Sequence, residues 1–219
     1  MKVKLVSNIL DANTAIAEEL KKRFRQQGVK VLNLMSAPGA GKTTILERTI
    51  EHLKGRVSLA VIEGDLCTTL DAERIAAQGV PVVQINTEGA CHLDANMIAR
   101  ALDDLPLEGL ELLIVENVGN LVCPAEFDLG EDYKVMVISV TEGNDKPSKY
   151  PLMFHESQVI LVNKLDLLPY TDFDLERLRQ DLAELNPRAR VFPVSARTGE
   201  GMAAWAEWLE QQAAGAGGG

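Results

Sequence analysis

The chain has 219 residues, a formal net charge of -10 at pH 7, 46% hydrophobic residues and three cysteines. This apolar fraction can fill a hydrophobic core without stapling disulfides, and an odd number of cysteines without paired spacing is typical of a reducing compartment, so we expect a cytoplasmic protein. The acidic charge argues against nucleic acid as a partner, and no run reaches the roughly 18 apolar residues of a membrane helix, so a membrane is not expected either.

Short apolar runs alternate with amphipathic segments along the chain. The apolar runs predict strands at 31–35, 58–62, 80–85, 110–115, 134–140, 158–163 and 189–195. The segments between them predict helices at about 12–27, 42–54, 70–78, 94–104, 172–185 and 200–213. Most strand runs are apolar at successive positions, which is typical of strands covered on both faces. We therefore expect an α/β fold with a mostly parallel central sheet flanked by helices. It forms one domain over 1–214, and 215–219 is a disordered Gly-rich tail.

The stretch "SAPGAGKTT" follows the first strong strand and opens a helix, which is the context of a phosphate-binding loop. Ser36 stands where such loops usually carry their first glycine. Small residues let backbone N–H groups face the phosphates, Lys42 neutralises the β and γ oxygens, and the Thr43 hydroxyl binds magnesium. The residues expected to contact the nucleotide here are Pro38, Gly39, Ala40, Gly41, Lys42, Thr43 and Thr44.

A second motif, "ILVNKLD", ends a buried strand with Asn163, Lys164 and Asp166. A carboxylate at the last position can accept from both N1–H and the exocyclic amine of guanine, whereas adenine offers no such pair of donors. Downstream, "VSARTGEG" places Ser195 and Ala196 where their backbone can support the base. This order of motifs predicts GTP as the nucleotide.

Carboxylates for magnesium or for a catalytic water lie between these motifs. "LLIVENVGN" ends a strand with Glu116, and Gly119 leaves room for a backbone N–H near the γ-phosphate. "EGDLCTTLD" supplies Asp65 and Asp71, either of which can bind magnesium or position water, and we favour Asp65 for magnesium. The alternative for either aspartate is an ordinary helix cap. The expected catalytic set is Lys42, Thr43, Asp65, Asp71, Glu116 and Gly119, and the expected magnesium ligands are Thr43, Asp65 and Glu116.

Together with "GACHLDANM", "ENVGNLVCPAEFDLGE" and "TEGNDKPSKYP", these motifs resemble the hydrogenase nickel-incorporation GTPases, the HypB family of SIMIBI-type P-loop NTPases. The resemblance covers about residues 5–210. It implies a metal site for Ni²⁺ or Zn²⁺ made by Cys91, His92 and Cys123, close to the interface of a nucleotide-dependent homodimer.

The spacing of that trio is compatible with one site. Cys91 and His92 end the loop after the strand at 80–85, and Cys123 lies just past Gly119, so we expect them to meet beyond the carboxyl ends of adjacent strands. Two thiolates and one imidazole suit zinc or nickel, but a closed tetrahedral site has four ligands. A second subunit or water must complete the shell. Cys67 has no partner in these motifs and is expected to be buried as a small apolar residue.

The resemblance implies a GTP-hydrolysing nickel metallochaperone that couples nucleotide state and dimerisation to nickel insertion during hydrogenase maturation. Its implied partners are a nickel-supplying accessory protein and the hydrogenase large subunit. Two alternatives remain open: nickel delivery to another enzyme, such as urease or carbon monoxide dehydrogenase, and a metal-binding module that the nucleotide stabilises without catalytic coupling. The Cys-x-x-Cys-Gly-Cys and histidine-rich stretches of many family members do not occur in this sequence. Nickel supply is therefore expected to depend on the GTPase-domain site or on a partner.

Overall fold

A computed structural model describes the backbone of residues 2–65 and 68–215 and the side chains from residue 10 onward in those ranges. The predictions for Cys67 and for the tail beyond residue 215 lie outside the described residues. The central sheet has the strand order β3-β2-β4-β1-β5-β6-β7, and each neighbouring pair is parallel. The strands are β1 (Lys30–Ser36), β2 (Leu59–Asp65), β3 (Val82–Asn86), β4 (Leu112–Glu116), β5 (Tyr133–Ser139), β6 (Val159–Asn163) and β7 (Arg190–Pro193). The predicted parallel α/β sheet is confirmed.

The predicted helices are also confirmed, although the first begins at Lys2 and not at residue 12. The longer helices are α1 (Lys2–Gln27), α2 (Lys42–Leu53), α3 (Leu70–Ala76), α4 (Ala95–Ala101), α8 (Leu175–Leu185) and α9 (Met202–Ala214). Three short helices were not predicted: α5 (Cys123–Glu126), α6 (Lys146–Lys149) and α7 (Pro151–Glu156). Each has proline in its first turn, which favours a helix start, but each is too short to show helical periodicity. The 3₁₀ helices η1 (Val140–Glu142) and η2 (Leu165–Tyr170) follow β5 and β6.

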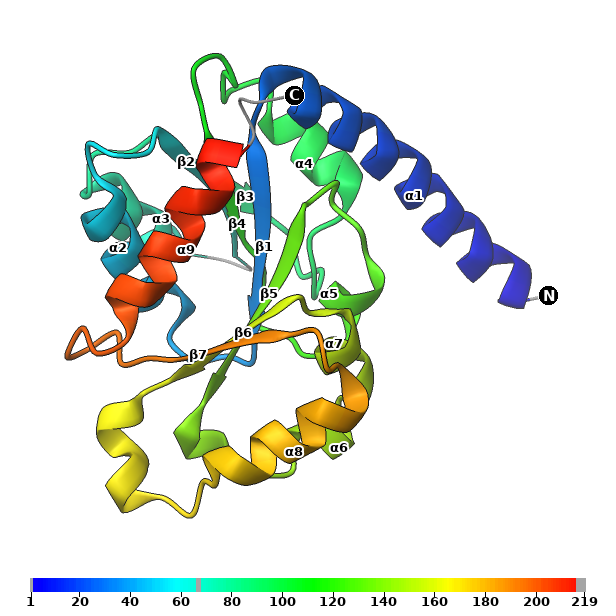
Figure 1. Ribbon diagram of the computed structural model, residues 1–219. Coiled ribbons are helices and arrows are strands. Elements are labelled where there is room, and N and C mark those ends of the chain that lie inside the picture. The colour runs from blue at the N-terminus through cyan, green and yellow to red at the C-terminus, as the bar shows by residue number, and fades with distance from the viewer. Residues whose placement is uncertain (1, 66–67, 216–219) are drawn as a thin grey trace.

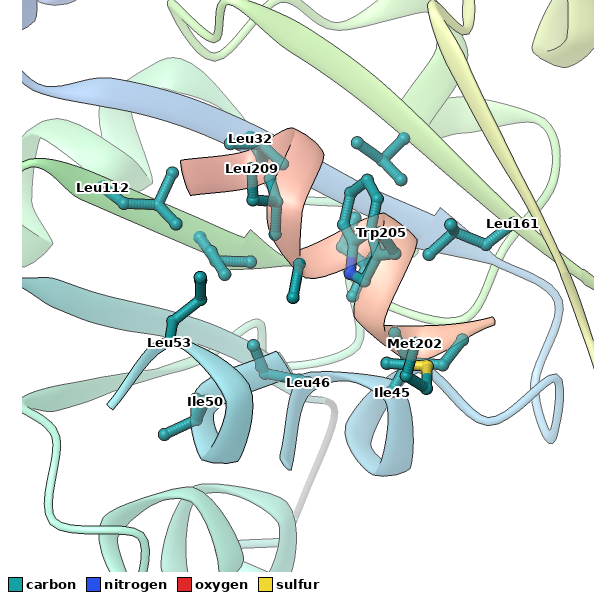
Figure 2. Close-up of a cluster of buried hydrophobic side chains, with 14 of the residues drawn as sticks. Leu32, Ile45, Leu46, Ile50, Leu53, Leu112, Leu161, Met202, Trp205 and Leu209 are labelled. Atoms are coloured by element: carbon teal, nitrogen blue, oxygen red, sulfur yellow. The ribbon is translucent and has the colours of Figure 1, made fainter. Parts of the chain in front are cut away.

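Helices cover both faces of the sheet (Figure 1). On one face, α2 and α9 pack over the strands, with Trp205 fully buried between them (Figure 2). Its indole Nε1 donates to Thr49 Oγ1 at 2.9 Å, which joins α9 to α2. On the other face, α1 and α4 bury one apolar cluster, and α7 and α8 bury another. The amino-terminal part of α1 extends beyond the body of the molecule (Figure 1). Among the described residues, no helix is both long and apolar enough to span a bilayer.

The strand order corrects one expectation about the metal ligands. The strands that precede Cys91 and Cys123, β3 and β4, are not adjacent, because β2 pairs with both of them. Glu63 of β2 is in register with Glu116 of β4 on one side and with Gln84 of β3 on the other. The central strand β1 lies between β4 and β5, with β2, β3 and β4 on one side and β5, β6 and β7 on the other. Its carboxyl end is therefore the topological switch point of the sheet. Ligands of open parallel sheets bind at such a point.

Candidate functional site

The loop between β1 and α2 has the geometry of a phosphate cradle. Lys42 Nζ donates to Ser36 Oγ at 2.9 Å, so the buried serine in the place of the usual glycine holds the lysine at the loop. Gly41 has φ 101°, and a Cβ there would lie 2.5 Å from Asn163 Nδ2. Only glycine fits that position without a shift of Asn163. The loop leads directly into α2, a helix of 12 residues, and the free backbone N–H groups at such a helix start favour an anion.

A cavity of about 390 Å³ opens in front of this loop. It is bounded by the loop itself and by the segments that follow β2 and β4. The structure brings the whole predicted catalytic set to this one cavity, which is lined by Lys42, Thr43, Asp65, Asp71, Glu116 and Gly119. Gly119 also packs against the loop, since a Cβ there would lie 3.1 Å from the backbone nitrogen of Pro38.

Two buried carboxylates face each other across β2 and β4. Thr43 Oγ1 donates to Glu116 Oε1 at 2.9 Å, and Glu63 is the register partner of Glu116. Burial raises the pKa of Glu63 to about 8 and that of Glu116 to about 7. Within the described part of the chain, neither Glu63 Oε2 nor Glu116 Oε2 has a hydrogen-bond partner. Oxygen atoms of this kind, beside a threonine hydroxyl, fit the preference of Mg²⁺ for oxygen ligands.

Other charged groups complete the cavity wall. Burial lowers the pKa of Lys42, and the nearby carboxylates, Glu116 first, act against that shift. Asp65 Oδ2 accepts from Thr68 N at 2.8 Å and from Thr68 Oγ1 at 2.7 Å. Asp71 accepts from Arg74 Nη1 at 2.9 Å, so a guanidinium also lies at the rim of the cavity.

The second motif forms a corner beside the cradle. Asn163 Nδ2 donates to Ala40 O at 2.9 Å, and Lys164 Nζ donates to Gly39 O at 2.7 Å, so both side chains brace the phosphate loop. Asn163 Oδ1 accepts from Ala196 N at 3.1 Å.

The carboxylate of the same motif is fixed from the neighbouring loop. Ser195 Oγ donates to Asp166 Oδ1 at 2.6 Å. Lys164, at φ 65°, makes the left-handed turn that aligns this segment. The residues predicted to read and support the base therefore lie together.

Three polar residues that line the cavity were not predicted from the sequence: Glu63, Arg74 and Asn117. The sequence did contain a signal for Glu63, because this charged residue directly follows the apolar run "SLAVI" of a predicted strand. For Asn117, the only signal was a polar residue directly after the buried strand β4. Arg74 lies in α3, where an arginine is an ordinary surface residue.

The metal trio also converges. The ligand atoms of Cys91, His92 and Cys123 all lie within 4.8 Å of one another. Cys91 Sγ is 3.1 Å from Cys123 Sγ and 3.6 Å from His92 Nδ1. Cys91 is exposed and the other two are half-buried, so an ion held here would be accessible from solvent.

The surroundings of the trio favour a neutral imidazole. The His92 ring lies 3.9 Å from the Phe127 ring, centroid to centroid, and burial lowers the pKa of His92. Two causes raise the pKa of Cys123: the hydrogen bond with Cys91, which is the larger, and burial. A neutral imidazole is the form that binds a metal, and an ion at the trio would displace the proton of Cys123.

The cradle after the central strand, the switch point of the sheet and the Asn-Lys-x-Asp corner define a P-loop GTPase. Comparison with known proteins agrees with this class. The signal recognition particle receptor FtsY from Elizabethkingia anophelis shares the fold, with a TM-score of 0.57 and 12% identity, over 92% of this chain and 72% of that chain. The fold is thus of the SIMIBI type.

Closer matches identify the family. The protein-family model described as "CobW/HypB/UreG, nucleotide-binding domain" matches residues 30–193 of this chain. The hydrogenase maturation factor HypB of Escherichia coli (strain K12) is 53% identical over 205 residues, which cover 94% of this chain and 71% of the relative. The crystal structure of HypB from Helicobacter pylori in complex with nickel has a TM-score of 0.88 and 38% identity, over 93% of this chain and 95% of that one. The chain belongs to the HypB family, and the resemblance indicated by the motifs is confirmed.

Proposed function

We propose that this protein hydrolyses GTP and uses its nucleotide state to control the binding and release of nickel for a hydrogenase under assembly. The observation that carries this proposal is the position of the metal trio. Cys91, His92 and Cys123 converge within 4.8 Å, and Cys123 follows shortly after the segment 117–119 that lines the phosphate cavity. The names of the relatives support the target, and the nickel complex of the Helicobacter pylori protein supports the ion.

In the proposed reaction, each part of the cavity has one task. The N–H groups of the cradle and Lys42 hold the β- and γ-phosphates and offset their charge. Thr43, Asp65 and Glu116 would hold magnesium, which when bound adds further positive charge at the phosphates. Asp71 would position the attacking water. Asn163, Lys164, Ser195 and Ala196 brace the corner in which Asp166 accepts the two guanine donors.

We further propose a nucleotide-dependent homodimer at the face that carries the metal trio. Three ligands from one chain leave a tetrahedral shell incomplete, so a second copy or water must supply the rest. Val122, which directly precedes Cys123, is 55% exposed. Exposed apolar side chains beside the site are the kind that a partner buries. A nickel-supplying accessory protein and the hydrogenase large subunit are the further proposed partners, and Zn²⁺ is the alternative ion.

A titration tests this function. Nickel and zinc are added to nucleotide-free protein and to its complexes with GDP and a non-hydrolysable GTP analogue, and the mass is measured in parallel. We expect the metal affinity to differ by roughly 5- to 150-fold between the two nucleotide complexes. Cys91→Ala and Cys123→Ala should lose this binding, whereas His155→Ala, at an exposed histidine, should retain it.

Three results would contradict the proposal. Equal metal affinities in the two nucleotide complexes would remove the coupling and leave a metal-binding module. Unchanged metal binding in both cysteine variants would remove the trio as the site. GTP turnover at the parent rate in Lys42→Ala would remove the assigned role of the cradle lysine.

A further inference from the structure

Two hydrogen-bonding side chains join the loop after β4 to the segment 87–94, which carries Cys91 and His92 and is called the metal loop below. Asn117 Oδ1 accepts from Leu93 N at 3.1 Å and from Val118 N at 2.9 Å. Asn120 Nδ2 donates to Cys91 O at 3.1 Å, and its Oδ1 accepts from Val122 N at 2.9 Å. Two asparagines, one at each end of the segment 117–120, thus hold the metal loop on both sides of His92.

Asn117 cannot adjust independently of the sheet. It is 1% exposed, and its Nδ2 donates to Asn33 Oδ1 of β1 at 3.0 Å. Asn33 Nδ2 in turn donates to Glu131 Oε1 at 3.4 Å. This buried chain fixes the orientation of the Asn117 amide, and a displaced Asn117 would leave buried polar groups without partners, which costs free energy.

The metal loop is equally constrained at Leu93. Its side chain is fully buried against β2, where a Cβ on Gly64 would lie 2.7 Å from Leu93 Cδ1. The Leu93 side chain is thereby anchored, so a shift of Asn117 would act on the peptide between His92 and Leu93 and not on the position of the Leu93 side chain. Because Leu93 directly follows His92 in the chain, the hydrogen bond from Leu93 N to Asn117 Oδ1 also constrains the backbone position of His92.

The nucleotide reaches the same segment from the other side. Asn117 and Gly119 line the phosphate cavity, and Gly119 packs against Pro38 of the cradle. A shift of 117–120 that accompanies a change at the γ-phosphate would act on the Cys91 carbonyl and the Leu93 amide at once. It would also act on Val122, which directly precedes Cys123 in α5.

We propose that Asn117 and Asn120 are positioning residues that transmit the nucleotide state from the phosphate cavity to Cys91 and His92. This inference rests on the proposed coupling of GTP to metal binding and names the contacts that carry it. Through the covalent chain alone, a shift of the segment 117–120 would move only Cys123 among the three metal ligands. The two asparagines take the other two ligands along, so the geometry of the whole trio follows the nucleotide.

The test compares asparagine variants that differ in what they remove. Asn120→Asp keeps an oxygen for Val122 N but replaces the donor to Cys91 O by an acceptor, and Asn120 is only half-buried. Asn117→Ser removes the long amide from the buried chain. The matched control is Asn144→Asp, because Asn144 also joins two segments, by donating to Asp172 O and accepting from Asp174 N, each at 2.7 Å.

Nickel affinity and the nickel–thiolate absorption spectrum are measured for each protein with GDP and with the GTP analogue, and the unfolding temperature is recorded. We expect the ratio of affinities between the two complexes to fall to within about twofold of one in Asn120→Asp and Asn117→Ser. Their spectra should no longer differ between nucleotides. Asn144→Asp should retain the parent ratio and the parent spectral difference. A role in loop stability alone would change both complexes equally and leave the ratio intact.

The two proposals fail in different ways. A parent protein with equal affinities in both complexes would overturn the coupling and, with it, this inference. A parent ratio of fivefold or more that persists in both asparagine variants would overturn this inference alone.

Discussion

In the proposed site, Asp166 would select the base with a single carboxylate. Ser195 Oγ donates to its Oδ1 at 2.6 Å, so the group is oriented before the nucleotide arrives. Asn163 and Lys164, from the same motif, donate to carbonyl groups of the cradle. The proposed base preference would therefore depend on Asp166, while its neighbours keep the corner in position.

Asp166→Asn should exchange the preferred nucleotide. The amide offers a donor where the guanine exocyclic amine needs an acceptor, and xanthine presents a carbonyl at that position. We expect GTP affinity to fall by at least about 100-fold and xanthosine triphosphate to become the better ligand. Competition binding with both nucleotides and ATP measures this, with Asp172→Asn, at an exposed aspartate, as the control. Unchanged GTP preference in Asp166→Asn would exclude Asp166 as the reader.

The sequence predicted these site residues where a short motif contains the whole chemical unit. A charge after an apolar run marked Glu63 in the sequence, but its role could not be predicted, because that role depends on the cross-strand register that sets it opposite Glu116. Asn117 was missed for the same reason: its partners, Leu93 and Asn33, come from other parts of the chain. Residues whose function is a tertiary contact leave little trace in local sequence.

At the level of elements, α9 stabilises α2, the helix that begins at the phosphate cradle. Trp205 is 2% exposed, stacks against Trp208 at 5.4 Å between ring centroids, and donates to Thr49 Oγ1 of α2. Buried apolar side chains of both helices belong to one cluster, together with side chains of the sheet.

Trp205→Phe should lower the free energy of unfolding by roughly 1–3 kcal/mol, because it removes the bond to Thr49 and leaves a small cavity. Urea unfolding followed by circular dichroism measures the loss. Trp208→Phe makes the same change at a ring that does not donate to Thr49, and a smaller loss is expected there. Equal losses in the two variants would show that the Thr49 bond contributes nothing.

The elements themselves were mostly predictable, but their neighbours in space were not. Continuous apolar runs identified the seven strands, because a buried parallel strand needs apolar side chains on both faces. The insertion of β2 between β3 and β4 has no local signature, since either order buries the same side chains. The prediction of adjacent strands below Cys91 and Cys123 was wrong for that reason, yet the loops after β3 and β4 are long enough for the ligands to meet.

For the whole molecule, buried carboxyl groups make stability depend on pH. Glu131 is 5% exposed, its Oε2 accepts from Leu129 N at 2.6 Å, and burial raises its pKa to about 7. The folded protein then holds this proton at pH values where the unfolded chain, with the ordinary pKa of 4.5, has released it. The stabilisation is fully present below the unfolded pKa and is lost as the pH rises through the folded value.

Glu131→Gln should therefore reduce the fall in unfolding free energy between about pH 5 and 8, by on the order of 1–3 kcal/mol. Urea unfolding of metal-free, nucleotide-free protein at several pH values measures how the unfolding free energy changes with pH in the parent and in the variant. Glu63 and Glu116 contribute in the same direction in parent and variant, so the difference isolates Glu131. Glu108→Gln, at an exposed glutamate, is the control. Parallel pH profiles for parent and Glu131→Gln would contradict the assignment.

The order of the sheet also separates two kinds of information about the nucleotide. β3, β2, β4 and β1 come from the first part of the chain and carry the cavity and the metal trio, whereas β5, β6 and β7 come from the second part and carry the base corner (Figure 1). GTP and GDP share the base and differ only in the γ-phosphate. With the function proposed above, the second half of the molecule would bind both nucleotides through the same contacts, and the first half alone would register hydrolysis. In the proposed cycle, the carboxy-terminal half keeps the guanine nucleotide bound while the amino-terminal half changes its hold on the ion.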